Sequence, residues 1–162
     1  MLHEKPVKPV ERRRITIGVA ESVTCGRLQA KIGKSDDLAE LFKGGITAYS
    51  IDQKVQHLGV DANHASRTDC VSARVADEMA MGACCLFGVE IGLGTTGFAE
   101  CSAKRKAPFG FWSLCRNDGA CLKILARGKV KGGLSISRSA MQELIAERAF
   151  RGLLRYLKKA RA

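Results

Sequence analysis

The chain has 162 residues, of which 46% are hydrophobic, and a formal net charge of +11. A chain of this length is expected to form one domain with a core large enough to be stable without disulfides or a structural metal. It contains no run near the roughly 18 apolar residues of a membrane-spanning helix, and residues 1–14 lack the apolar stretch of a secretory signal. We therefore expect a basic, disordered flank at 1–14, one domain at 15–162, a cytoplasmic location and no membrane partner.

Seven cysteines are scattered along the chain without a Cys-x-x-Cys pair. This spacing argues against a zinc site and a disulfide framework, and it predicts small, buried side chains in a reducing compartment, except for Cys25, which stands in a candidate site loop. Part of the positive charge lies in residues 1–14 and part in the segment 148–161. The charge favours anionic metabolites. It also allows a nucleic-acid partner, which we rank lower because no nucleic-acid-binding motif accompanies it.

The first half of the chain is predicted to alternate strands and helices. Apolar, partly β-branched residues at 15–20 predict a buried strand. Ser35 is typical of a helix start, and Gly44-Gly45 is typical of a helix end. The other elements predicted here are a helix at 27–32, a second strand at 46–49, and a helix from Ser50 through Leu58.

The second half is predicted to hold two long helices with strands between them. Apolar residues at helical spacing predict helices at 73–87 and 138–158. A third strand is predicted around 89–93, and the turn residues at 116–119 predict a hairpin between strands at 111–115 and 121–126. This order predicts an α/β protein with three layers, α/β/α, whose mostly parallel mixed sheet has an antiparallel edge hairpin.

Two phosphate-binding motifs are matched only in part. The segment 92–97 has the spacing G-x-G-x-x-G after a predicted strand, but an irregular stretch with Pro108 follows where a dinucleotide site needs a helix. Gly33-Lys34-Ser35 resembles the end of a P-loop, but Leu28 stands at the position of the first glycine. We therefore expect neither a Rossmann site nor a P-loop.

The passage from the first strand into the next helix is the strongest candidate for a site, because α/β sheets bind ligands at the carboxyl ends of their strands. Ser22 would lie at the strand end, and free amides around Thr24, Cys25 and Gly26 would point outward at a helix N-terminus. Such amides stabilise an anion, either a phosphate or a developing oxyanion. On the residues alone, Ser22 is either a nucleophile or a plain helix cap.

Four segments are similar to motifs of one known family. They are A-E-S-V-T-C-G at 20–26, G-G-I-T-A-Y-S at 44–50 with Lys54 and L-G-V at 58–60, V-S at 71–72 with the small residues of 76–83, and T-G at 96–97. On these residues the chain resembles the C-terminal domain of the CinA family. The resemblance implies a nicotinamide-nucleotide amidase, which hydrolyses nicotinamide mononucleotide, or a related anionic carboxamide, to nicotinate mononucleotide and ammonia.

The resemblance also implies roles for particular residues. Ser22 would be the nucleophile, Lys54 the base that activates it, and Tyr49 a proton donor or relay. A lysine can act as a base only if burial or nearby cations lower its pKa from about 10. Arg138 would clamp a phosphate. The resemblance implies no metal or redox cofactor and a homo-oligomeric assembly, and the further substrate-binding residues that it implies are Thr24, Gly26, Thr96 and Gly97.

The chain departs from the family pattern in several places, among them the segment 136–138 and Gln142, where the family has G-D-R and a following arginine, and the absence of a helix before the first strand. Two further departures lie at the expected site. Cys25 stands where the family has a glycine, and residues 98–106 replace a glycine-rich loop with bulkier and charged side chains. Within this segment we expect Lys104, Arg105 and Lys106 to replace part of the lost amide contacts to an anion. The departures leave an alternative function open: a family member without turnover that binds a nucleotide as a regulatory or interaction module.

Overall fold

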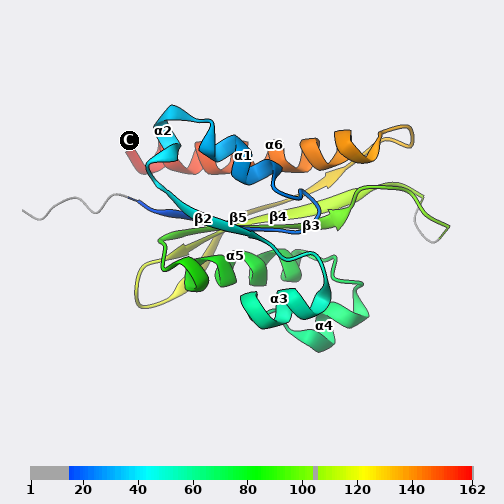
Figure 1. Cartoon of the computed structure of the whole chain (residues 1–162), viewed down its shortest axis with the longest axis horizontal. Coiled ribbons are helices and arrows are strands. Elements are labelled where there is room, and N and C mark those ends of the chain that lie inside the picture. Colours follow the sequence, from blue (N-terminus) through cyan, green and yellow to red (C-terminus); the bar gives the residue numbers. More distant parts are fainter. Residues whose placement is uncertain (1–14, 104–105, 162) are drawn as a thin grey trace, which may run out of the picture.

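The computed structural model describes residues 15–103 and 106–161, so the flank predicted at 1–14 lies outside the described residues. Five strands form one sheet in the order β2-β1-β3-β4-β5, with helices on both faces (Figure 1). The strands are β1 (Ile17–Glu21), β2 (Phe42–Thr47), β3 (Ile91–Phe98), β4 (Phe109–Asn117) and β5 (Leu122–Lys131). The helices are α1 (Arg27–Gly33), α2 (Asp36–Ala39), α3 (Ile51–Leu58), α4 (Ala62–Arg67), α5 (Ala73–Phe87) and α6 (Arg138–Arg161).

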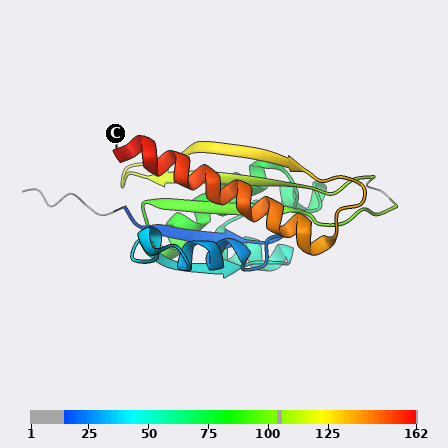
Figure 2. The same cartoon turned by 90° about the horizontal axis from the view of Figure 1, so that it is seen from above.

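The sheet is mixed, as predicted for an α/β fold. β1 pairs in parallel with β2 and with β3, whereas β4 pairs antiparallel with both β3 and β5. The antiparallel part therefore includes the β3–β4 pair as well as the predicted hairpin of β4 and β5. Helices α1, α2 and α6 cover one face, and α3, α4 and α5 cover the other (Figure 1). The long helix α6 runs obliquely across its face of the sheet (Figure 2).

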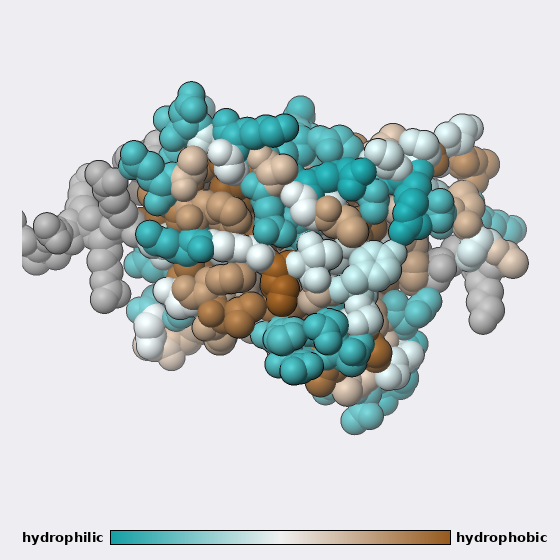
Figure 3. Space-filling view, viewed as in Figure 1, coloured by the Kyte–Doolittle hydropathy of each residue, from teal (hydrophilic) through white to brown (hydrophobic). Residues whose placement is uncertain are grey.

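Each face of the sheet carries its own part of the core. One cluster joins β1 and β3 to α1 and α6 through residues such as Val19, Leu28 and Ile145. The other joins the sheet to α3 and α5 through residues such as Leu58 and Met79. On the face of the molecule shown in Figure 3, hydrophilic residues lie over both helical layers, and apolar residues are visible between them. In the described part of the chain, none of the helices combines the length and apolar character needed to cross a bilayer.

The glycines of the segment 92–97 serve packing. Gly92 and Gly94 lie inside β3, and a Cβ atom at either position would overlap a backbone carbonyl oxygen of α5, that of Ala80 or that of Ala76. Their lack of a side chain lets α5 lie directly against the sheet. The motif is therefore part of a strand–helix contact, in agreement with the prediction that it does not form a Rossmann site.

Several predicted boundaries are wrong because tertiary contacts override local preference. Gly44 and Gly45 were expected to end a helix but lie within β2, where a Cβ on Gly44 would come within 2.9 Å of the Phe87 ring. The preceding helix α2 has only four residues, and α4 was not predicted. Buried and exposed residues do not alternate along β3, since Ile91 through Thr96 are all buried between two helical layers.

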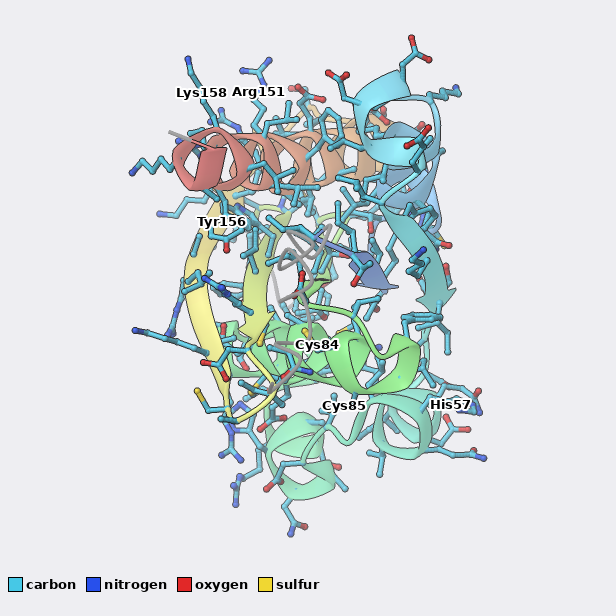
Figure 4. The ribbon with its side chains drawn as sticks, turned by 90° about the vertical axis from the view of Figure 1, so that its left-hand side faces the viewer. His57, Cys84, Cys85, Arg151, Tyr156 and Lys158 are labelled. Carbon is cyan, nitrogen blue, oxygen red and sulfur yellow. The ribbon has the colours of Figure 1, made fainter. Side chains whose placement is uncertain are left out.

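The expectation that the cysteines are buried holds for only part of the set. Cys84 and Cys115 are buried, and Cys70 is intermediate. The side chains of Cys84 and Cys85 diverge from neighbouring positions on α5, so one is buried and the other exposed (Figure 4). The other exposed cysteines are Cys25, Cys101 and Cys121, and all seven are free thiols. Loop and surface positions therefore hold most of the set.

Candidate functional site

A pocket of about 310 Å³ opens beside the carboxyl ends of β1 and β3. Its wall is built by the residues after β1, the start of α3, the turn between α4 and α5, the segment from the end of β3 to residue 102, and the first residue of α6. The structure thus brings together six of the eight residues predicted for the site, namely Ser22, Tyr49, Lys54, Thr96, Gly97 and Arg138.

Lys54 lies almost completely buried in the pocket wall, with 1% of its surface exposed. It shares a face of α3 with Leu58, one helical turn later, and this face packs toward α5. Its Nζ atom donates a hydrogen bond to the carbonyl oxygen of Tyr49 at 2.6 Å. Burial lowers the pKa of Lys54 from its ordinary value, while Cys70 and Asp52 nearby oppose this shift. Lys54 is therefore a buried residue and not a solvated helix lysine.

Ser22 follows β1 directly and is 6% exposed. Its backbone N–H donates to the carbonyl oxygen of Thr95 at 3.1 Å, which fixes the serine beside β3. Within residues 15–103 and 106–161, the Ser22 hydroxyl has no hydrogen-bond partner, and no hydrogen bond joins it to Lys54. Ser22 and Lys54 thus line one pocket without a hydrogen bond between them.

The amides at the start of α1 are occupied by a side chain that sequence reasoning did not assign. Glu21 is fully buried, and its carboxylate accepts hydrogen bonds from the N–H groups of Gly26, Leu28 and Gln29 at 3.0, 3.1 and 2.8 Å. A buried carboxylate at a helix N-terminus satisfies donors that would otherwise lack partners. The prediction that the amides around Gly26 are free for a ligand is therefore wrong at Gly26.

Neither the side chain of Thr24 nor Gly26 lines the pocket with the other predicted residues. Thr24 is fully buried, and its hydroxyl bonds that of Thr95 at 2.7 Å, so it ties the loop to β3. Gly26 has a φ of 91°, which suits a glycine and lets the chain turn into α1. The amide N–H groups of Val23 and Thr24 have no acceptor among the described residues, so they are the donors that this loop leaves available.

A second wall of the pocket comes from the turn between α4 and α5. Asp69 and Cys70 both have left-handed φ angles, 51° and 58°, and both line the pocket with Val71. The carbonyl oxygen of Cys70 accepts a hydrogen bond from the Thr96 hydroxyl at 2.7 Å, which holds this turn against β3. Sequence reasoning missed the turn, because an Asp-Cys pair gives no signal for two successive left-handed residues.

The rim of the pocket is a charged contact between three segments. Arg138 donates one hydrogen bond from Nη1 to the Glu100 carboxylate and one from Nη2 to the Tyr49 hydroxyl, each at 2.8 Å. These contacts with Tyr49 and Glu100 raise the pKa of Arg138. The predicted phosphate clamp is therefore at the pocket, but an internal carboxylate is bound to it.

The last residue of β3 and the segment after it line the pocket through Phe98, Ala99, Glu100, Cys101 and Ser102. Sequence reasoning named this segment for its basic cluster and gave Glu100 no role. Lys104 and Arg105 lie outside the described residues, and Lys106 is exposed and does not line the pocket. At Lys106, the expectation of a basic group that replaces lost amides is therefore wrong.

The layered sheet and the pocket lined by Ser22 and Lys54 define an α/β domain with a pocket at its strand ends. Residues 1–157 match the model of the CinA C-terminal domain, and the chain belongs to this family. A protein named "Putative competence-damage inducible protein" from Streptococcus equi subsp. equi is 35% identical over 123 residues, which are 74% of this chain and 29% of that relative. A CinA-like protein from Kosmotoga olearia is 39% identical over 98 residues, 60% of this chain and 24% of that protein.

The chain therefore spans less than a third of the length of the curated relatives it matches. Among solved structures, competence/damage inducible protein CihA from Agrobacterium tumefaciens superposes with a TM-score of 0.75 and 21% sequence identity. The match covers 87% of this chain and 84% of that one. At this identity the likeness shows the fold alone, and it agrees with the mixed sheet and helical layers described above.

Proposed function

We propose that the chain is a CinA-type amidohydrolase that releases ammonia from nicotinamide mononucleotide or a related anionic carboxamide. The observation that carries the proposal is the amine of Lys54, buried in the same pocket as the hydroxyl of Ser22. Because burial lowers the pKa of Lys54, a larger fraction of this amine is neutral than for an exposed lysine. A neutral amine beside a serine hydroxyl is the pair that a serine–lysine mechanism needs.

In the proposed reaction, the Ser22 oxygen attacks the carboxamide carbon while neutral Lys54 takes the hydroxyl proton. The lysine then gives this proton to the departing nitrogen, and ammonia leaves an acyl ester on Ser22. A water molecule, deprotonated by Lys54, hydrolyses the ester and releases the carboxylate product. The hydrogen bond from the Lys54 amine to the Tyr49 carbonyl uses an N–H group, so the lone pair of the neutral amine stays available to accept the Ser22 proton.

The N–H groups left without an acceptor suit the negative charge that develops on the substrate oxygen. Those of Val23 and Thr24 lie next to Ser22 in the chain, and within the described residues nothing else accepts from them. Backbone donors of this kind stabilise a tetrahedral intermediate. The pocket volume of about 310 Å³ is near the lower end of small-molecule sites, so we expect part of a nucleotide to remain outside.

A second candidate is a nucleotide-binding module without turnover. Two observations favour it: Ser22 and Lys54 are not hydrogen-bonded to one another, and Arg138 is bound to Glu100. This alternative predicts binding of nicotinamide mononucleotide or nicotinate mononucleotide without ammonia release. The two functions therefore differ in one measurable step, the release of ammonia.

The deciding experiment measures ammonia release from nicotinamide mononucleotide by the purified protein and by Ser22→Ala. A matched control is Ser66→Ala, which removes a hydroxyl from an exposed position on α4 away from the pocket. The amidase proposal requires release by wild type and by the control, and loss in Ser22→Ala. Equal release by Ser22→Ala would exclude the serine mechanism. Binding without release by wild type would favour the module.

A further inference from the structure

The guanidinium of Arg138 has both of its terminal nitrogens engaged within the protein. Nη1 donates to a Glu100 oxygen and Nη2 to the Tyr49 hydroxyl, each at 2.8 Å. These two nitrogens form the edge with which an arginine binds a phosphate through two parallel hydrogen bonds. Two of the five guanidinium N–H donors are therefore committed to internal partners, and a phosphate that binds both terminal nitrogens competes with these partners for the same edge.

Glu100 occupies the place that an anionic ligand group would take. Its carboxylate has the charge and the planar pair of acceptor oxygens that arginine recognises in both carboxylates and phosphates. Glu100, Arg138 and Tyr49 all line the same pocket as Ser22 and Lys54. A bound phosphate on Arg138 would also lie beside the Glu100 carboxylate, and the two like charges would repel one another.

We propose that Glu100 is an internal competitor for the phosphate group of the substrate, and that it sets how strongly the pocket discriminates between phosphorylated and unphosphorylated ligands. The inference rests on the proposed function for the identity of the ligand, since it concerns the same pocket. Without substrate, Glu100 holds Arg138 across the rim. When a phosphorylated ligand binds, the phosphate takes Nη1, and the Glu100 side chain moves to solvent.

The exposure of the pair makes this exchange easy. The side chains of Arg138 and Glu100 are 47% and 57% exposed. An ion pair in such a setting contributes little to stability, because water and salt screen both charges. Displacing Glu100 therefore costs little, yet its removal should still be measurable in ligand affinity. We expect Glu100→Gln to bind nicotinamide mononucleotide about two- to fivefold more tightly.

The test titrates two ligands, nicotinamide mononucleotide and nicotinamide riboside, which differ only in the phosphate. All titrations use a Ser22→Ala background so that the ligand is not consumed. The variants are Glu100→Gln and, as a control with the same change in net charge, Glu147→Gln. Glu147 also pairs with an arginine, Arg151, at 2.7 Å on α6, but it does not line the pocket.

The expected result is a gain of about two- to fivefold for the mononucleotide in Glu100→Gln, no gain for the riboside, and no gain for either ligand in Glu147→Gln. Added salt should reduce the gain. Equal affinities of Glu100→Gln and its parent, a weaker affinity, or an equal gain for both ligands would each overturn the proposal. So would a failure of both proteins to bind the mononucleotide.

Ammonia release separates this proposal from the proposed function. If wild type hydrolyses the mononucleotide and Glu100→Gln has an unchanged KM and affinity, the amidase stands and the role of Glu100 fails. If no form releases ammonia but Glu100→Gln gains affinity for the mononucleotide alone, the role of Glu100 stands and the amidase fails.

Discussion

The floor of the pocket is formed by side chains that are almost completely buried, whereas its rim is formed by side chains that are about half exposed. Ser22 and Lys54 are 6% and 1% exposed, and Glu21, which precedes Ser22 in the chain, is fully buried. Tyr49 and Arg138 at the rim are 56% and 47% exposed. A buried group has its position and its pKa set by the fold, while an exposed group keeps alternative partners in water.

This difference separates two tasks. The floor can hold a base with a lowered pKa and a nucleophile in fixed places, because the elements around them pack in one way. The rim can exchange one anion for another, because its ion pair between Arg138 and Glu100 is about half exposed and therefore weak. We therefore expect substitutions at the floor to act on the chemical step or on stability, and substitutions at the rim to act on ligand preference.

The largest effect is expected for the pair Ser22 and Lys54. Ser22→Ala and Lys54→Ala should each lower kcat for ammonia release by at least about a thousandfold, since each removes a partner of the same proton transfer. The double variant should lose little more than either single variant. A further large loss in the double variant would show that the two residues act independently. Circular dichroism of each variant checks that the fold is retained.

The next largest effect is expected on the free energy of unfolding when the buried carboxylate of Glu21 is removed. Glu21→Ala should lower the free energy of unfolding by about 2–4 kcal/mol, because three backbone N–H groups, one buried and two partly buried, lose a charged acceptor. Glu21→Gln, which keeps one acceptor oxygen, should lose about half as much. Denaturant unfolding measures both. The comparison variant is Glu143→Ala, whose half-exposed carboxylate pairs with Lys31 on the surface and should cost less than about 1 kcal/mol. Similar losses for Glu21 and Glu143 would contradict the contrast between buried and exposed carboxylates.

A smaller effect should appear in the pH dependence of stability. Burial lowers the pKa of Lys54 below the ordinary value of 10.5. Between the folded pKa and 10.5, the unfolded chain holds a proton that the folded chain has released, so stability rises with pH. The slope of this contribution is at most about 1.4 kcal/mol per pH unit. The variant Lys54→Met has no amine at this position and therefore lacks this contribution to the pH dependence of stability.

Denaturant unfolding of wild type and Lys54→Met from about pH 7 to about pH 10 measures this difference. Wild type should gain stability relative to the variant as the pH rises. A constant difference across this range, or a change of the opposite sign, would show that the Lys54 amine keeps its ordinary pKa. In active protein, the rate of ammonia release should rise with pH through the same lowered pKa, because the neutral amine is the base.

The smallest effect is expected at the rim. Tyr49→Phe removes the hydroxyl that accepts from Arg138 and leaves the backbone carbonyl that holds Lys54. We expect kcat/KM for the mononucleotide to fall by no more than about tenfold, mainly through KM, because an exposed hydrogen bond contributes little. Steady-state kinetics with both nicotinamide ligands tests this. A loss of a hundredfold or more in kcat would mean that the Tyr49 hydroxyl takes part in proton transfer, and the contrast between floor and rim would fail.

Much of the architecture could be predicted from local pattern. The apolar periodicity of α5 and α6 and the turn residues between β4 and β5 predicted these elements closely, because they depend on neighbours in the chain. Local pattern failed at Gly44 and Gly45, where the choice between a helix end and a strand depends on the distant Phe87 ring. The exposure of Cys85 and the burial of Cys84 followed from their directions on one helix.

By itself the sequence determined the composition of the pocket floor, because Ser22 and Lys54 each stand in a segment whose residues and spacing resemble one family. Only the tertiary structure decided which groups are free to act. It buried the Lys54 amine, placed the Glu21 carboxylate on the Gly26 amide that was expected to be free for a ligand, and brought Glu100 to Arg138 from 38 residues away. Hydrogen bonds and burial of this kind depend on which segments meet across the sheet, and no local pattern in the chain encodes that meeting.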